Sequence, residues 1–120
     1  MTRHAAFMLL ATLLAGCTTA SHLRDSQATA MYRGNGSVQD IAACVSAAWS
    51  QKPVHLVTNV LYGGTTIEIH MNDRAPAVAL VDIKPVSDKT VASYYSSFKD
   101  DDSWYFEQID HCVTATPAPN

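Results

Sequence analysis

The alternation of apolar and polar residues predicts a helix that begins near residue 37. One apolar stripe at helical spacing consists of Ile41, Cys44, Val45, Ala48 and Trp49. Residues at this spacing lie on one face of a helix. Ser37 precedes the stripe, and Asp40 follows Ser37 by three residues, a pattern that resembles a capping box. Pro53 ends the helical segment.

Two alternating segments after this helix predict a β-hairpin. Residues 54–61 and 65–71 are the expected strands, and Gly63-Gly64 is the expected two-residue loop. With this loop, Tyr62 faces Thr65 and Leu56 faces Met71. A single register then sorts both strands into a mostly apolar face and a polar face, which favours the hairpin.

The remainder of the folded region predicts two more strands and a final helix. Residues 77–84 form a nearly continuous apolar run, and residues 89–98 favour a strand over the alternative of a helix because β-branched and tyrosine residues prefer strands. The acidic residues 100–102 suit the free N–H groups at a helix start. The stripe that follows them consists of Tyr105, Ile109, Cys112 and Val113. The predicted fold class is α+β, a two-layer sandwich of helix, four-stranded antiparallel meander and helix, with both helices on one face.

The first seventeen residues have the pattern of an export signal. Arg3 is positive, and the apolar run over residues 5–15 is too short to cross a bilayer. The run leads into Leu14-Ala15-Gly16-Cys17, which resembles the lipobox of bacterial lipoproteins. The resemblance implies cleavage before Cys17, a diacylglycerol on its sulfur and an acyl chain such as palmitate on its freed amine. An ordinary secretory signal that is cut later and an uncleaved anchor are the alternatives.

The residue after the cysteine bears on location. In lipoproteins of the enterobacterial type, Asp at this position favours retention in the inner membrane, and this chain has Thr18. The resemblance therefore implies the outer membrane, with the protein facing the periplasm. Several acyl chains anchor a protein durably, whereas one chain binds only marginally.

The chain has three cysteines. With Cys17 assigned to the lipid, Cys44 and Cys112 remain, and an oxidising periplasm predicts one disulfide between them. The chain-entropy argument gives about 4 kcal/mol of stabilisation for a loop of this size. Two buried free thiols are the alternative, and a metal pair is disfavoured because the spacing of the cysteines and histidines does not support one.

The predicted domain organisation has four parts. Residues 1–16 are the signal peptide, residues 17–36 a lipidated flexible tether, residues 37–113 the α+β domain and residues 114–120 a disordered tail. Few residues are left for the core, so a disulfide is the expected supplement to apolar burial.

Charge and motifs limit the function. Eight Lys and Arg against eleven Asp and Glu give a net charge of −3, and this lack of a basic footprint disfavours nucleic-acid binding. Recognised catalytic motifs are missing, so the sequence predicts no catalytic residue and no cofactor. His111 beside Cys112 suggests a nucleophile pair only if the disulfide is absent.

Two groups of residues are candidate sites. His55, Glu68 and His70 share the polar sheet face and have the chemistry to hold a divalent metal, but we expect an ordinary solvated face and no metal site. The second group is a possible partner surface that consists of Asp100, Asp101, Asp102 and Trp104. Helix capping is the alternative role for the three acids, and core packing is the alternative for the aromatic residues.

The cysteine placement and element order resemble those of small envelope lipoproteins without an assigned activity, and this resemblance brings no catalytic residues. We expect a non-enzymatic binding or structural module, held at the membrane by acyl chains on Cys17, with an envelope protein as possible partner. The alternative is an inhibitor or immunity protein against a toxin or lysozyme, with Lys99 to Phe106 as the segment that enters a cleft. A small periplasmic enzyme is a third, less favoured hypothesis.

Overall fold

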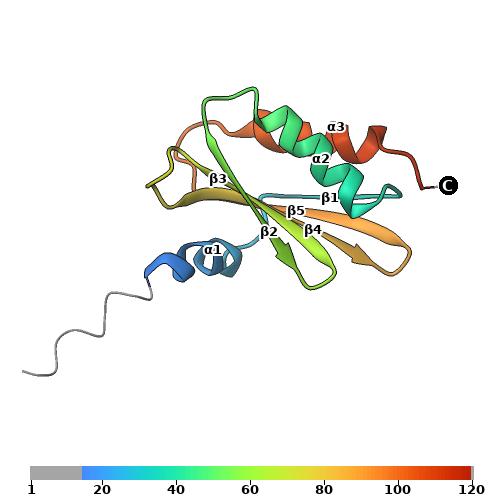
Figure 1. The fold of residues 1–120 in the computed structure, drawn as a ribbon, viewed down its shortest axis with the longest axis horizontal. Coiled ribbons are helices and arrows are strands. Elements are labelled where there is room, and N and C mark those ends of the chain that lie inside the picture. Colours follow the sequence, from blue (N-terminus) through green and yellow to red (C-terminus); the bar gives the residue numbers. More distant parts are fainter. Residues whose placement is uncertain (1–14, 120) are drawn as a thin grey trace, which may run out of the picture.

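The computed structural model describes residues 15–119, and the side chains of residues 20–119. This part of the chain forms three helices and five strands (Figure 1). In chain order they are α1 (Ala15–Asp25), β1 (Ala30–Gly34), α2 (Val38–Trp49), β2 (His55–Leu61), β3 (Gly64–His70), β4 (Ala77–Val86), β5 (Lys89–Ser96) and α3 (Ser103–Ala115).

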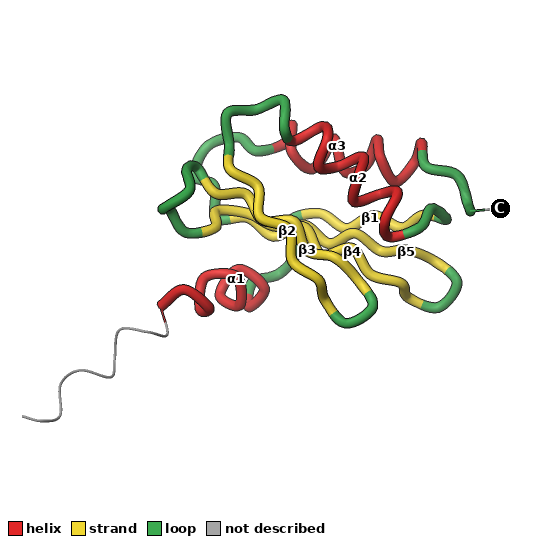
Figure 2. The backbone as a smooth tube through the Cα atoms, in the orientation of Figure 1, coloured by secondary structure: helices red, strands yellow, loops and turns green. Residues whose placement is uncertain are grey.

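The strands form one antiparallel sheet in the order β1-β5-β4-β3-β2. Helices α2 and α3 lie side by side on one face, and α1 lies on the opposite face (Figures 1 and 2). The predicted α+β class and the antiparallel sheet are confirmed, and so is the choice of a strand over a helix for residues 89–98, of which β5 covers Lys89–Ser96. The predicted number of elements is wrong, because the described chain has a fifth strand and a third helix outside the predicted sandwich.

Both extra elements fall in the segment predicted to be a flexible tether. Over residues 20–34 the structure has most of α1 and the edge strand β1 instead. Strand β1 is short and pairs with β5, with Tyr32 opposite Ala92. Its five residues carry too short a pattern to reveal a strand without the neighbour that they pair with.

Helix α2 begins as the sequence predicts. The Ser37 hydroxyl accepts a hydrogen bond from the backbone N–H of Asp40 at 3.1 Å, so Ser37 is the N-cap. Ile41, Val45 and Trp49 from the predicted stripe are completely buried. The cap and the periodicity together were therefore sufficient to locate this helix.

The β2–β3 hairpin has the predicted faces but a different register. Leu61 pairs with Gly64 and Leu56 with Ile69, so the loop is Tyr62-Gly63 rather than Gly63-Gly64. Gly63 has φ +77°, which suits the turn. Gly64 lies in β3, where any Cβ would collide with the Ile83 carbonyl of β4. One glycine thus serves the turn and the other serves a close approach between strands. The shift is two residues, so every side chain keeps its predicted face.

The core lies between the sheet and the pair α2 and α3. Trp49 is its largest completely buried side chain. The indole N–H of Trp49 donates to the Tyr105 carbonyl of α3 at 3.0 Å, and the ring meets Tyr94 of β5 edge-on at 6.2 Å between centroids. Trp49 of α2 therefore contacts both α3 and the sheet.

Helix α3 extends beyond the predicted domain end. Thr114 and Ala115, predicted to belong to the tail, are the last residues of the helix. Thr116 follows it and its hydroxyl donates to the Cys112 carbonyl at 2.6 Å. The Thr116 backbone N–H donates to the same carbonyl at 3.1 Å, so Thr116 closes the last turn of the helix through both groups.

We predict that Gly64→Ala lowers the free energy of unfolding by about 1–3 kcal/mol, because β3 and β4 must separate to admit a methyl group. Urea unfolding measures this loss. Tyr62→Ala in the same hairpin is the control, because Tyr62 is fully exposed and surface substitutions change stability by about 0.5 kcal/mol or less. Equal stability of the two variants would show that the strands do not approach so closely.

Candidate functional site

The sheet face opposite α2 and α3 carries a row of polar side chains, and it is the candidate site. Its members are Thr66 and Glu68 of β3, Asp82 of β4, His55 of β2 and His70 of β3, with Arg24 contributed by α1. They alternate along the strands with the core residues, because successive side chains of a strand point to opposite faces. We call this row the polar strip.

Asp82 is the most buried charge of the polar strip, with 2% exposure. Arg24 binds it with both carboxylate oxygens engaged, Nε to Oδ2 at 2.8 Å and Nη2 to Oδ1 at 2.9 Å. The Thr66 hydroxyl donates to Asp82 Oδ1 at 2.6 Å and accepts from Arg24 at 3.1 Å. A planar guanidinium matches a carboxylate in this way, which gives the contact both strength and a fixed orientation.

The ionisation of Asp82 follows from these contacts. Burial alone would raise the pKa of this carboxyl, but the hydrogen bonds from Arg24 and Thr66 and the positive charge of Arg24 outweigh burial, so the pKa lies below its ordinary value. The hydrogen bond to Asp82 raises the pKa of Arg24 in turn. The pair is therefore a fixed ion pair and not a group that exchanges protons near neutral pH.

The same contacts hold α1 on the sheet. Leu23 is buried against Leu80 and Ala77, and Arg24 is the next residue of the helix. Apolar and ionic contacts thus act at adjacent positions. They account for an ordered α1 where composition predicted a tether.

His70 and Glu68 form the second part of the polar strip. His70 Nε2 lies 2.8 Å from Glu68 Oε1, and Nδ1 lies 2.7 Å from the Ala75 carbonyl. The Asn59 amide donates to the other Glu68 oxygen at 3.0 Å. Both partners of the imidazole are acceptors, so a doubly protonated ring can donate to both and a neutral ring to only one. The network ties the loop before β4 to the end of β3.

The structure brings the three residues of the metal hypothesis together. His55 pairs directly with His70 across β2 and β3, and their rings meet edge-on at 6.2 Å. Both nitrogens of His70 already face protein oxygens, however. For the residues that the structure describes, no group of three or more His, Cys, Asp or Glu side chains has the geometry to hold a metal ion.

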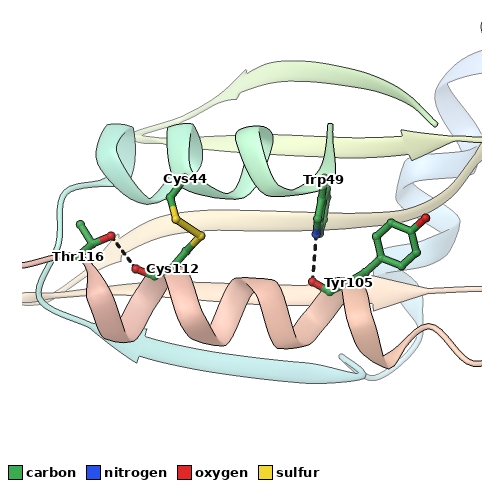
Figure 3. The surroundings of a disulfide bond; sticks show 5 residues. All are labelled: Cys44, Trp49, Tyr105, Cys112 and Thr116. Carbon is green, nitrogen blue, oxygen red and sulfur yellow. Dashed lines mark hydrogen bonds between the residues drawn. A yellow bond between two sulfur atoms is a disulfide. The ribbon is translucent and has the colours of Figure 1, made fainter. Parts of the chain in front are cut away.

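The disulfide between Cys44 and Cys112 is present, as predicted. Figure 3 shows it between α2 and α3, and the hydrogen bond from Trp49 to Tyr105 joins the same two helices further along α2. The Cα atoms are 5.7 Å apart, within the usual range for a disulfide. With Cys112 in this bond, it is not available as a nucleophile beside His111.

The residues proposed as a partner surface divide into two pairs. Asp100 and Asp101 are exposed. Asp102 accepts a hydrogen bond from the Tyr94 hydroxyl at 3.0 Å, and Lys52 lies over the ring of half-buried Trp104 at 4.6 Å. Burial of Tyr94, and to a lesser degree the nearby Asp102 charge, raises the pKa of the tyrosine.

The three acids were also predicted as caps of the final helix, and one of them, Asp101, has this role. Asp102 is at the N-cap position but makes no side-chain capping bond, since its carboxylate is engaged by Tyr94. Asp101 accepts from the Ser103 backbone N–H at 2.9 Å instead. The helix start is therefore supported by one of the three predicted acids.

A shallow hollow of about 390 Å³ lies between the β4–β5 turn, the start of α2 and the C-terminal residues. Two pairs of its polar groups are bonded to each other: Thr90 donates to the Gly36 carbonyl at 2.6 Å, and Lys89 donates to Asn35 at 2.5 Å. These bonds join the segment before α2 to the start of β5.

The lipobox lies at the edge of what the structure describes. Residues 1–14 are outside the described part, and so is the side chain of Cys17, although the backbone of α1 begins at Ala15. Lipidation of Cys17 therefore stays a prediction. Among the described residues, no helix is both long and apolar enough to cross a membrane.

Comparison with known proteins finds no family model, no curated protein and no solved structure that matches this chain. The functional argument therefore rests on the residues of the chain itself.

Sequence interpretation missed the ion pair of the polar strip. Asp82 was visible as a lone acid within an apolar strand, and a charge in that position requires a partner. The partner was not predictable because Arg24 lies 58 positions away, in a segment with the composition of a tether.

We predict that Asp82→Asn lowers the free energy of unfolding by about 1–3 kcal/mol, because an amide group then faces the Arg24 donors. Asp25→Asn, at an exposed position of α1, is the control and should have little effect. The contribution of Asp82 is complete above about pH 4, the ordinary pKa of an unfolded Asp. This contribution is lost as the pH falls through the lower pKa of Asp82 in the folded state. The free energies of unfolding of Asp82→Asn and Asp25→Asn should therefore converge in acid. A constant difference between them at every pH would contradict the ion pair.

We also predict that replacing both Cys44 and Cys112 by Ala lowers the free energy of unfolding by about 2–5 kcal/mol. Denaturant unfolding of the parent with and without reductant measures the same bond a second way. If neither the substitution nor the reductant moved the midpoint, α2 and α3 would be held by packing alone.

Proposed function

We propose that this chain is a lipid-anchored lipoprotein of the bacterial envelope that acts as a non-enzymatic binding or structural module. The disulfide is the observation that carries the proposal. It engages two of three cysteines, and such bonds persist in oxidising compartments such as the periplasm. The remaining Cys17 is the residue that ends the lipobox-like sequence, and Thr18 after it favours the outer membrane.

The docking of α1 supports a short connection between anchor and domain. Cys17 precedes Leu23 by six positions within α1, a helical rise of about 9 Å. Leu23 and Arg24 are fixed to the sheet by apolar packing and the ion pair. An anchored Cys17 would thus hold the domain close to the lipid headgroups rather than at the end of a flexible tether.

The use of the titratable side chains supports a module without catalysis. Asp82 is bound by Arg24, Glu68 by His70 and Asn59, and the Tyr94 hydroxyl donates to Asp102. Each of these groups satisfies a neighbour within the fold. Such a domain presents its surface to a partner, and its polar interior maintains the shape of that surface.

The experiment is the intact mass of the full-length gene product extracted from membranes of a bacterial host. We predict the mass of residues 17–120 plus a diacylglycerol and one acyl chain, less two hydrogens for the disulfide. Cys17→Ser should be neither cleaved at this position nor acylated, so its mass should not show this cleavage or any lipid. An unacylated parent, or a Cys17→Ser variant with the same mass change and distribution, would refute the anchor.

A further inference from the structure

We infer that β2 is an interface through which two copies of this chain pair edge to edge, with the two β2 strands antiparallel. β2 is at one end of the sheet, and no described strand pairs with its outer side. Helix α2 packs mainly on β3 and β4, and α3 on β1, so the helices leave this edge open. The inference does not depend on the lipid anchor.

The edge has none of the features that usually prevent strand pairing. Residues 55–61 contain no Lys, Arg, Asp, Glu, Pro or Gly, and the register irregularity of β3 lies at Ile69 and His70, not on the β2–β3 ladder. Charged side chains, prolines and bulges are the common protections of edge strands. The opposite edge, β1, carries Arg33 and is covered by α3.

The backbone groups available for pairing follow from the hairpin. Residues that flank a two-residue loop exchange both of their hydrogen bonds, so Leu61 and Gly64 form such a pair. Alternation along the strand then directs the N–H and C=O groups of Leu56, Thr58 and Val60 away from β3. These three residues are the donors and acceptors that an added strand would meet.

A second copy fits this edge because the three residues are complementary to themselves. In an antiparallel pair centred on Thr58, each Val60 lies opposite Leu56 of the other copy, and about six main-chain hydrogen bonds form. Val60 is 90% exposed in the single chain and would be covered by an apolar neighbour. Leu56, Thr58 and Val60 carry no formal charge, so the pairing places no like charges opposite each other at this contact.

The contact is short, which sets the expected strength. A pair of seven-residue strands falls below the roughly 1,200 Å² of stable standard interfaces, in the range of weak and transient ones. We therefore expect an association that depends on concentration.

The test is oxidative cross-linking of the full chain through single added cysteines. Thr58→Cys brings the two sulfurs to the two-fold axis, where paired Cα atoms are about 5.5 Å apart, within the range that a disulfide spans. Val60→Cys is the matched control: it is at least as accessible, but the two copies of residue 60 are about 14 Å apart at about 3.4 Å per residue. The parent chain reports any cross-link through Cys17.

We expect a disulfide-linked dimer of Thr58→Cys several-fold more abundant than that of Val60→Cys or the parent. Equal yields from the two variants would overturn the inference, and so would a Thr58→Cys adduct with a chain of a different mass in place of the dimer.

As a second measurement, two differently tagged full chains are co-purified. Thr58→Lys in both copies should abolish co-purification, whereas Met71→Lys, at an exposed position outside β2, should preserve it. Unchanged co-purification of Thr58→Lys would also overturn the inference.

Discussion

The layer of α2 and α3 depends on one covalent bond. Cys44 and Cys112 join the two helices, and the Trp49 hydrogen bond to Tyr105 joins them again nearer the C-terminal end of α2. Two connections at different points along a helix pair fix both its spacing and its direction. Since these helices supply one half of the core, the position of Trp49 against Tyr94 and the sheet follows from the same constraint. A domain this small gains from such a bond because it has little apolar surface to bury.

On the sheet face opposite α2 and α3, the main constraint is the ion pair between Asp82 and Arg24. Placing Asp82 at 2% exposure is unfavourable unless its charge is paired and hydrogen-bonded, and Arg24 and Thr66 supply those contacts. The pairing has a structural consequence beyond its own energy, because Arg24 belongs to α1. It positions the helix that contains Cys17. In the proposed function, the ion pair would determine how the domain lies on the membrane, while the disulfide maintains the shape of the surface it presents.

Sequence alone was sufficient where the signal was local. The cap at Ser37 and the stripe of Ile41 and Trp49 located α2, and the alternation of the hairpin assigned every side chain to its face. The hairpin register was missed because two adjacent glycines suit the same turn, and only the proximity of β4 shows that Gly64 belongs to the strand. β1 and α1 were missed for a related reason. A five-residue edge strand and a helix with a single buried leucine are stabilised by partners far along the chain, and those partners are not visible in the segment itself.

The same limit applies to the candidate sites. Proximity of His55, Glu68 and His70 was predictable from alternation, but the bonds that occupy both nitrogens of His70 were not. The disulfide was predictable only because the lipobox-like sequence accounted for the third cysteine. The most direct test of this account is therefore a non-reducing peptide map of the alkylated protein from membranes. It should show the Cys44 and Cys112 peptides linked and no alkylated Cys17, whereas three alkylated cysteines would contradict it.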